Sequence, residues 1–362
     1  MDQTDRAPNV ADLLADDESR GARLRRRTGS IGLELTVFAL VTGLFPVLAL
    51  VALVIDAALW VRRRKPWMAL RLLALVWWML AIELYGLLRL LPLVVSPARR
   101  DPERYRPWIY RLLHWWLSSH LAGLRVIFGL EFDVDGLEHA GPGPVVILVR
   151  HASSLDTLLP EAFIAPAHGL RLRYVLKREL LRLPTLDIGR RWAPGVFVRR
   201  GTGDTVDALD RLRLLTTGLG DEDGIVIYPE GTLYNDQKLA RAKRVTAKRQ
   251  PAIAPLVARL RHVLPPRPAG TLALLRSAAH ADVVICGHVG LARFEYLSDI
   301  WQGELVGSTV RMKIWRHAAS DVPVGDEEAF AEWLYERWFE LDDWIEAQLA
   351  GAGTRAAATA AA

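Results

Sequence analysis

A histidine and an aspartate lie five positions apart, directly after an apolar run of the sequence. Residues 145–149 lead through Arg150 to His151, and Asp156 follows. A histidine can accept a proton from a hydroxyl group near neutral pH, and a nearby carboxylate would fix its tautomer and stabilise the imidazolium. The pair would work as a base and its orienting group. A structural histidine at the end of a strand is the alternative, and in a chain with nine histidines the spacing alone decides little.

A second apolar run ends in a tight turn that contains a carboxylate and a glycine. Residues 225–228 lead into Glu230, Gly231 and Thr232. Glycine lets the backbone approach a ligand closely, and exposed amides in such a turn can hold a phosphate. The segment is therefore a candidate binding turn, with an ordinary strand-to-loop connection as the alternative.

A third apolar run, residues 195–198, ends at Arg199 and Arg200. Guanidinium groups recognise phosphate through paired hydrogen bonds, so two arginines at the end of a strand suit a phosphate-bearing ligand. An ordinary turn is again the alternative.

The secondary-structure elements that must position these residues alternate as in an α/β domain. Over residues 129–350, short apolar runs alternate with helical stretches, which predicts a mostly parallel central sheet flanked by helices. Ligands of open α/β sheets bind at the carboxyl ends of the strands. A helix is predicted over residues 327–349, and residues 351–362 are predicted to be disordered. The predicted strands are 144–149, 172–176, 195–198, 225–228, 271–275 and 283–289.

The N-terminal part of the chain is expected to contact a membrane. Residues 1–30 are predicted to form a polar, basic tail. Two apolar segments follow at 31–60 and 67–95, and each is longer than the roughly 20 residues that cross a bilayer as a helix. Residues 31–96 are therefore predicted to form a two-helix membrane hairpin.

The orientation of this hairpin is open at the level of the sequence. Basic clusters precede the first segment and separate the two segments, so a spanning hairpin would place them on opposite sides, which the positive-inside rule disfavours. Charged residues inside the segments are costly in hydrocarbon unless they pair. We favour a hairpin embedded from the cytoplasmic face of the cell membrane, with two ordinary spans as the alternative. The charged residues are Glu34, Asp56, Arg71, Glu83 and Arg89.

Residues 105–128 combine tryptophans and leucines with arginines at helical spacing. The pattern predicts an amphipathic helix that lies at the lipid interface. A helix packed on the following domain shows the same pattern and is equally favoured.

Charge and cysteine content exclude several classes of function. The formal net charge of +5 favours anionic partners, but no zinc-finger, RNP-like or helix-turn-helix pattern accompanies the basic residues. We therefore expect anionic membrane lipids, and no nucleic acid, as partners. Cys286 is the single cysteine, which excludes an internal disulfide and a cysteine-based zinc cluster. Its apolar surroundings predict a buried position in a strand.

Taken together, the segments resemble the glycerophospholipid acyltransferase family, of the lysophosphatidic acid acyltransferase type. The His-x4-Asp pattern comes first, a Lys-x-Glu-Leu segment begins at Lys177, a Phe-x-x-Arg segment ends at Arg200, and Glu-Gly-Thr begins at Glu230, in the order of the family. Residues 262–270 resemble a segment of the branch that acts on lysophosphatidate, lysophosphatidylinositol and lysocardiolipin.

The resemblance implies a glycerol-phosphate acyltransferase-like fold, His151 as the general base and Asp156 as its partner. It also implies an acyl-CoA or acyl carrier protein donor, with no cofactor and no metal. The favoured acceptor is a lysophospholipid, 1-acylglycerol-3-phosphate, which would give phosphatidic acid. The expected substrate-binding residues, from the resemblance and from the turns described above, are Lys177, Arg199, Arg200, Glu230, Gly231 and Thr232.

Two positions depart from the pattern of the family. Arg150 stands where the family often has asparagine, and Leu233 stands where an arginine often follows Glu-Gly-Thr. The second change removes one phosphate-binding charge, which Arg199, Lys238 or Arg150 could replace. Three alternatives therefore stay open: another acceptor such as lysophosphatidylinositol or lysocardiolipin, a CoA-independent transacylase, and a catalytically silent lipid-binding protein on the same fold.

Overall fold

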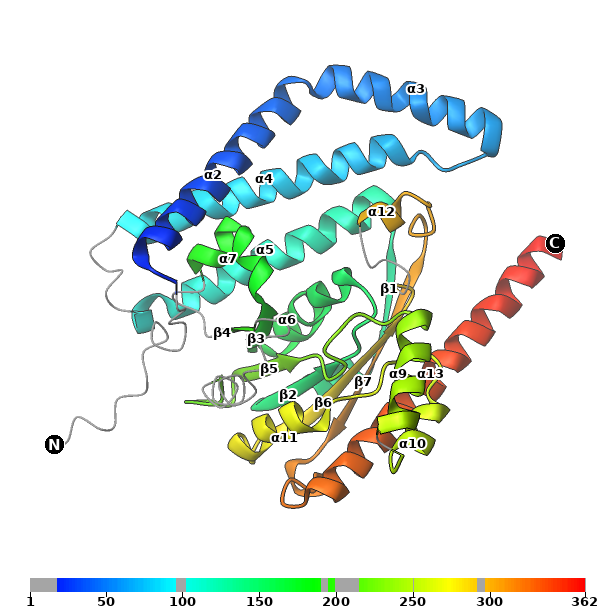
Figure 1. The fold of residues 1–362 in the computed structure, drawn as a ribbon. Helices are drawn as coiled ribbons and strands as arrows, with labels where there is room; N and C mark the ends of the chain where they lie inside the picture. Colours follow the sequence, from blue (N-terminus) through cyan, green and yellow to red (C-terminus); the bar gives the residue numbers. More distant parts are fainter. Residues whose placement is uncertain are drawn as a thin grey trace. The chain divides into compact units, whose positions relative to one another are not determined.

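The structure is a computed structural model that divides into two compact units (Figure 1). Unit 1 comprises Met1–Glu131, Arg173–Gly218 and Ile300–Ser308, and unit 2 comprises Phe132–Leu172, Leu219–Asp299 and Thr309–Ala362. The residues that the structure describes are 18–95, 102–189, 195–198, 215–249, 251–291 and 297–361.

The N-terminal helices of unit 1 are α2 (Arg20–Gly43), α3 (Phe45–Arg63) and α4 (Met68–Val95). The apolar segment predicted over 31–60 is therefore two helices and not one. Proline lacks an amide proton, so Pro46 is placed in the first turn of α3, where no helical hydrogen bond is lost. Residues 20–30, predicted to belong to a polar tail, are already helical, because Ser19 accepts the amide of Ala22 and caps α2.

Helices α3 and α4 are long and apolar enough to cross a membrane by length and composition. Large apolar side chains are exposed along both helices, among them Val47, Leu50 and Leu88. The choice between a spanning and an embedded hairpin stays a prediction.

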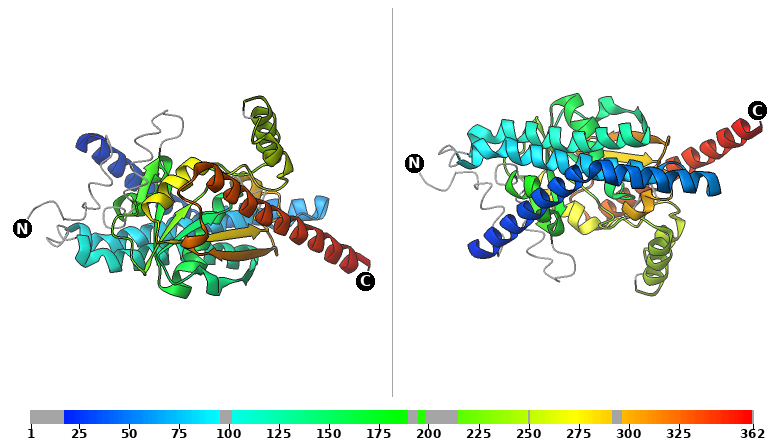
Figure 2. Two further views of the ribbon diagram at one scale, coloured as in Figure 1. Left: turned by 90° about the horizontal axis from the view of Figure 1, so that it is seen from below. Right: turned by 90° about the horizontal axis from the view of Figure 1, so that it is seen from above.

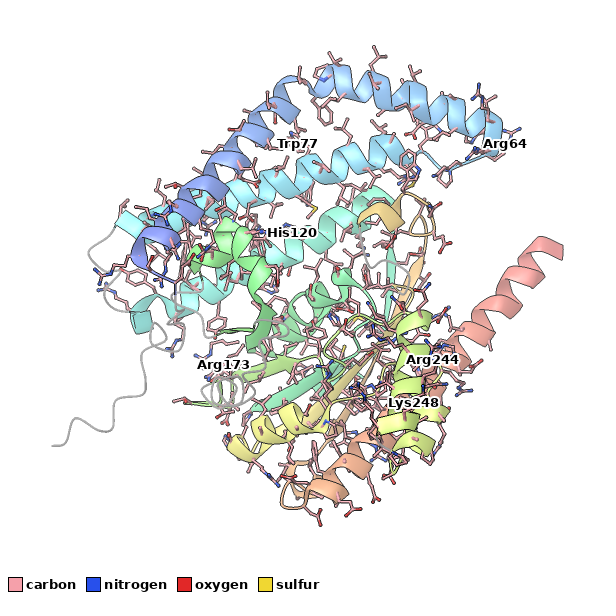
Figure 3. All side chains as sticks on the ribbon, in the orientation of Figure 1. Arg64, Trp77, His120, Arg173, Arg244 and Lys248 are labelled. Atoms are coloured by element: carbon pink, nitrogen blue, oxygen red, sulfur yellow. The ribbon has the colours of Figure 1, made fainter. Side chains whose placement is uncertain are left out.

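A tryptophan connects α2 to α4. The indole nitrogen of Trp77, labelled in Figure 3, donates to the hydroxyl of Thr42 at 3.1 Å. Its ring also contacts Phe38 and Phe45, with centroids 6.3 and 6.2 Å away. These contacts fix the first helices as a packed group.

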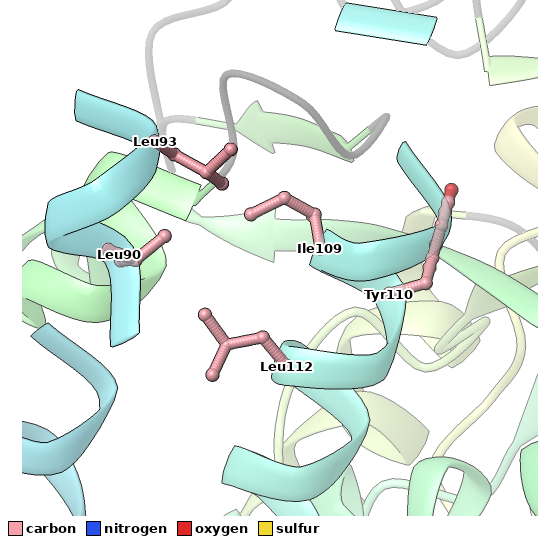
Figure 4. Close-up of a cluster of buried hydrophobic side chains, with 5 residues drawn as sticks. All are labelled: Leu90, Leu93, Ile109, Tyr110 and Leu112. Carbon is pink, nitrogen blue, oxygen red and sulfur yellow. The ribbon is translucent and has the colours of Figure 1, made fainter. Parts of the chain in front are cut away.

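Helix α5 (Pro102–Phe128) packs its apolar side against α4. Leu90 and Leu93 of α4 form a buried cluster with Ile109, Tyr110 and Leu112 of α5 (Figure 4). This side of α5 is therefore packed on the preceding helix. Contact of α5 with lipid and its packing on the following domain both stay predictions.

The sheet of unit 2 positions the candidate site. Its strands are ordered β1-β7-β6-β2-β5, and β2 pairs in parallel with both β5 and β6, whereas β7 is antiparallel to β6. In addition, β3 (Arg171–Lys177) pairs in parallel with β4 (Gly195–Val198). The prediction of an α/β fold with a mostly parallel sheet is confirmed. The bounds are β1 (Glu131–Asp135), β2 (Val145–Val149), β5 (Asp223–Ile227), β6 (Asp282–Val289) and β7 (Thr309–His317).

One predicted strand is wrong and two strands are missing from the prediction. Residues 271–275 lie in helix α11 (Pro268–Ser277), which starts with a proline at its first position and buries Leu272 and Leu275 on one side. Strand β7 alternates buried Val310, Met312 and Ile314 with polar residues, a period-two pattern that lacks a continuous apolar run. The short strand β1 has the same alternation.

Helix α13 (Glu327–Ala361) of unit 2 packs against β6 of this sheet. It buries Phe330, Leu334 and Trp338, as its helical pattern predicts, but it continues past residue 351, where disorder is expected from the sequence. Helix α9 (Asp236–Arg249) projects away from the strands of unit 2 (Figure 2). The other helices are α6 (Ala165–His168), α7 (Pro184–Gly189), α10 (Ala254–Arg259) and α12 (Leu297–Ile300). Shorter helical turns span Leu137–Ala140, Ser154–Leu158, Pro160–Ile164, Arg178–Arg182 and Ala319–Asp321.

Candidate active site

The His-x4-Asp segment forms a compact turn at the carboxyl end of the central strand β2. Ser153 caps the helical turn Ser154–Leu158 by accepting the amide of Leu155 at 3.1 Å. The Asp156 carboxylate folds back and accepts the amides of Ala152 and Ser153 at 2.8 and 2.9 Å. The five-residue spacing therefore returns the carboxylate to the start of its own turn, where His151 lies.

The structure brings His151 and Asp156 together, as the sequence predicts. The Nδ1 atom of His151 lies 3.1 Å from Oδ1 and 3.3 Å from Oδ2 of Asp156. A carboxylate accepts, so Nδ1 is assigned as the donor and Nε2 carries the free lone pair. Among the described residues, no hydrogen-bond partner of Nε2 is found. The ring is thus oriented at one nitrogen and available at the other.

Asp156 is held in its charged form. Burial alone would raise the pKa of Asp156, but the hydrogen bonds from His151 and His288 lower it below its ordinary value. An ionised Asp156 stabilises the imidazolium that forms when His151 takes a proton.

A second histidine, His288 of β6, also faces Asp156. Its Nε2 atom lies 3.5 Å from Oδ2 of Asp156 and 3.1 Å from the carbonyl oxygen of Arg150. Burial is the main reason that the pKa of His288 is lowered, so the ring is neutral at physiological pH. A lone histidine in an apolar strand gives no signal in the sequence, and this residue is missing from the prediction.

Glu230 connects the two strands that end at the site. Its Oε1 accepts the amide of His151 and its Oε2 accepts the amide of Leu264, both at 2.9 Å. Burial raises the pKa of Glu230 to about 8, although the two amides and the charge of Arg150 act in the opposite direction. Both oxygens are occupied by backbone amides, so Glu230 positions His151 in this structure, and a direct contact with substrate stays a prediction.

The remaining residues of this turn lie at the surface. Gly231 has a positive φ of 66° and is exposed, and Thr232 is half-buried. A residue with a side chain would be strained at that φ, which explains the glycine. The side chain of Lys177 at the end of β3, and Arg199 and Arg200 entirely, lie outside the described residues.

Arg150 does not serve as a free phosphate-binding charge. It is 1% exposed, and its guanidinium donates to the carbonyl oxygens of His288 and of His262, the latter at 2.8 Å. The arginine that replaces the usual asparagine therefore ties the end of β2 to β6 and to the loop at residue 262.

The half-buried Tyr228 and the buried Cys286 complete the surroundings of the site. The Tyr228 ring lies 4.5 Å from the His151 ring, centroid to centroid. Cys286 is free and buried in β6, as predicted, and burial, with the charge of Asp156, raises the pKa of its thiol to about 12, which makes it a poor nucleophile. The described residues contain no group of three or more histidine, cysteine, aspartate or glutamate side chains arranged for a metal ion.

The chain is similar in sequence to known acyltransferases. Residues 131–259 match the family model "Acyltransferase". The chain is 23% identical to lysophosphatidylinositol acyltransferase 10 of Caenorhabditis elegans over 65% of this chain and 61% of that protein. It is 32% identical to a 1-acyl-sn-glycerol-3-phosphate acyltransferase of Pseudomonas aeruginosa over 38% of this chain and 50% of that protein.

Two further comparisons cover more of the chain. Lysocardiolipin acyltransferase 1 of Danio rerio is 23% identical over 70% of this chain and 64% of that protein. A crystal structure of the 1-acyl-sn-glycerophosphate acyltransferase PlsC from Thermotoga maritima covers 77% of this chain and 96% of its own, with 16% identity and a TM-score of 0.49. The chain thus spans half to just under two thirds of the length of these three curated relatives.

Proposed function

We propose that this chain, which belongs to the acyltransferase family, transfers a fatty acyl group from a thioester donor to the free hydroxyl group of a lysophospholipid. The observation that carries the proposal is the His151 ring, held by Asp156 at Nδ1 and without a partner among the described residues at Nε2. Acyl-CoA or acyl carrier protein is the proposed donor, and 1-acylglycerol-3-phosphate is the proposed acceptor.

In this reaction the substrate supplies the nucleophile. Nε2 of His151 takes the proton of the acceptor hydroxyl as the oxygen attacks the thioester carbonyl. The tetrahedral intermediate collapses, the carbon–sulfur bond breaks, and the leaving thiolate receives the proton from the imidazolium. Asp156 stays ionised throughout and stabilises the imidazolium.

The direct test uses the purified full-length protein with labelled acyl-CoA and a panel of lysolipids. We expect transfer by the wild type and a loss of at least about 100-fold in kcat for His151→Ala, the lower end of a general-base contribution. His280→Ala is the matched control, because His280 is exposed. Retention of more than about a tenth of the activity by His151→Ala, with an unchanged melting temperature, would contradict the role of base.

The panel separates the alternatives. Transfer from acyl-CoA to a lysolipid excludes a CoA-independent transacylase as the main activity. Binding of a lysolipid without transfer from any donor would favour a silent lipid-binding protein. Preference for lysophosphatidylinositol or lysocardiolipin would replace the proposed acceptor.

We further propose that the N-terminal helices hold the catalytic unit at the cytoplasmic face of the cell membrane. The support is the apolar surface of α3 and α4 and the basic residues at the carboxyl end of α3, Arg62, Arg63 and Arg64. A cysteine placed at position 64 tests the side, since Cys286 is buried and does not compete for an impermeant reagent. Strong labelling in intact cells would exclude the embedded hairpin.

A further inference from the structure

The exposed turn at Gly231 lies against an arginine from a distant part of the chain. A Cβ atom added to Gly231 would lie 3.2 Å from the Cζ, Nε and Nη1 atoms of Arg267. The arginine is anchored at this place, because its backbone amide donates to the carbonyl oxygen of Pro229 at 2.9 Å. This backbone hydrogen bond holds Arg267 next to the turn, so its guanidinium lies beside Gly231.

The guanidinium of Arg267 is available to a ligand. Arg267 is exposed, and among the residues that the structure describes no carboxylate or carbonyl oxygen binds its guanidinium. A guanidinium offers a planar pair of donors that fits two oxygens of one phosphate. Glycine at position 231 lets the guanidinium lie this close to the turn, because a side chain there would crowd it.

Leu233 does not fill this role, and neither do the two other basic residues considered for it, Arg150 and Lys238. Leu233 is 5% exposed and apolar. Arg150 is buried and bound to two carbonyl oxygens. Lys238 donates to the carbonyl oxygen of Leu233 at 3.0 Å. Unlike Arg150 and Lys238, Arg267 has an exposed guanidinium for which no partner is found among the described residues.

The turn is also joined directly to the base. Glu230 precedes Gly231 and accepts the amide of His151. A ligand whose phosphate lies at Gly231 and whose hydroxyl lies at His151 would therefore contact two segments that one carboxylate holds together. A lysophospholipid acceptor carries both groups on one glycerol.

We propose that Arg267 binds the phosphate of the acceptor beside the Gly231 turn and supplies the charge that Leu233 does not. This inference rests on the proposed function, because it assigns a specificity residue to the same reaction. The ligand chemistry is a phosphomonoester, which presents the oxygens and the charge that a guanidinium binds best.

The test compares Arg267→Gln, Arg267→Lys and the control Arg241→Gln in the full-length protein. Arg241 is an exposed arginine of α9, ten positions after Gly231, and it belongs to neither turn. For Arg267→Gln we expect the KM for 1-acylglycerol-3-phosphate to rise about 10- to 100-fold, as for loss of a charge-assisted pair of hydrogen bonds, with kcat little changed. The KM of Arg267→Lys should lie between those of the wild type and Arg267→Gln, because lysine keeps the positive charge but cannot donate the paired hydrogen bonds of a guanidinium.

Two further arms identify the source of the phosphate. With monoacylglycerol, which has no phosphate, the wild type and Arg267→Gln should have equal KM values. The KM for acyl-CoA should also be unchanged; a rise confined to acyl-CoA would assign Arg267 to the donor and overturn the proposal. Equal KM values for 1-acylglycerol-3-phosphate in the wild type and Arg267→Gln would overturn it as well.

A binding measurement separates this inference from the proposed function. Equilibrium binding of 1-acylglycerol-3-phosphate to the solubilised full-length protein needs no donor. One outcome is that the wild type transfers no acyl group while the Arg267→Gln variant binds this lipid more weakly than the wild type does. In that case the proposed function fails and the phosphate site stands. If transfer occurs and binding is insensitive to Arg267→Gln, the phosphate site fails alone.

Discussion

Buried carboxylates occur both in the apolar N-terminal helices and in the candidate site, and they do different things. Asp56 of α3 accepts three amides at the start of α4, those of Met68, Ala69 and Leu70, at 2.9 to 3.0 Å. Asp156 accepts two amides as well, but it also faces His151. Burial of a carboxylate is therefore no sign of chemistry by itself.

The buried glutamates of the two regions, unlike the aspartates, play the same role. Glu83 of α4 accepts the amide of Thr185 and the indole nitrogen of Trp116, and Glu230 accepts the amides of His151 and Leu264. Each joins segments that are distant in sequence, because an unpaired carboxylate in an apolar interior is costly. What marks Asp156 is a titratable partner whose second nitrogen is open.

The largest effect should come from Asp156→Asn. The amide group of asparagine would donate to Nδ1 of His151, so the proton of the ring would move to Nε2 and the base would be lost. We expect kcat to fall on the order of 10³-fold or more, measured with labelled acyl donor and a lysophospholipid.

Asp56→Asn is the matched control, since it makes the same chemical change in a carboxylate that also accepts backbone amides. It should leave kcat within about threefold of the wild type, because no titratable ring depends on Asp56. An equal loss of kcat in both variants would show that the two carboxylates do not differ in role.

The next effect concerns the pH dependence of stability at Glu230. Its pKa rises on folding from 4.5 to about 8, so the folded protein retains this proton over a pH range in which the unfolded chain has lost it. The contribution of Glu230 to the free energy of unfolding is therefore present in full below pH 4.5 and is lost as the pH rises toward 8. The lowered pKa of Asp156 has the opposite sign, and its contribution is lost only in acid.

Glu230→Gln isolates this term. Between pH 5 and pH 8 the free energy of unfolding of the wild type should fall relative to that of the variant, as measured by chemical denaturation. A difference that is constant across this range would show that Glu230 titrates normally. The variant should also be less stable at low pH, by about 1 to 3 kcal/mol, because the glutamine amide group cannot accept the second backbone amide.

Local patterns were sufficient to predict the strands that carry the site. The continuous apolar runs of β2, β5 and β6 reflect burial on both faces of a parallel sheet, and the polar residues directly after β2 and β5 lie where ligands of such sheets bind. The contact of His151 with Asp156 followed from spacing and from the family resemblance. The helix α11 was mistaken for a strand because a short apolar run fits either structure.

Partners that are far apart in sequence were beyond such patterns. Arg150 was a candidate for phosphate binding, and only the fold shows that its charge is used by carbonyl groups 112 and 138 positions away. The contact of His288 with Asp156 and that of Arg267 with Gly231 are of the same kind. Each depends on which strand lies beside which, and no local spacing encodes that.

The smallest effect, on stability alone, should come from Asp56→Ala. Asp56 is fully buried and satisfies three amides at the start of α4, which would otherwise lack acceptors. Loss of such a cap costs about 0.5 to 2 kcal/mol, so the melting temperature of the solubilised protein should fall while kcat per folded molecule stays near that of the wild type. Asp321→Ala is the control, since Asp321 is exposed. A lower kcat at an unchanged melting temperature would mean that this part of the helices acts on the catalytic unit and does not merely hold α3 to α4.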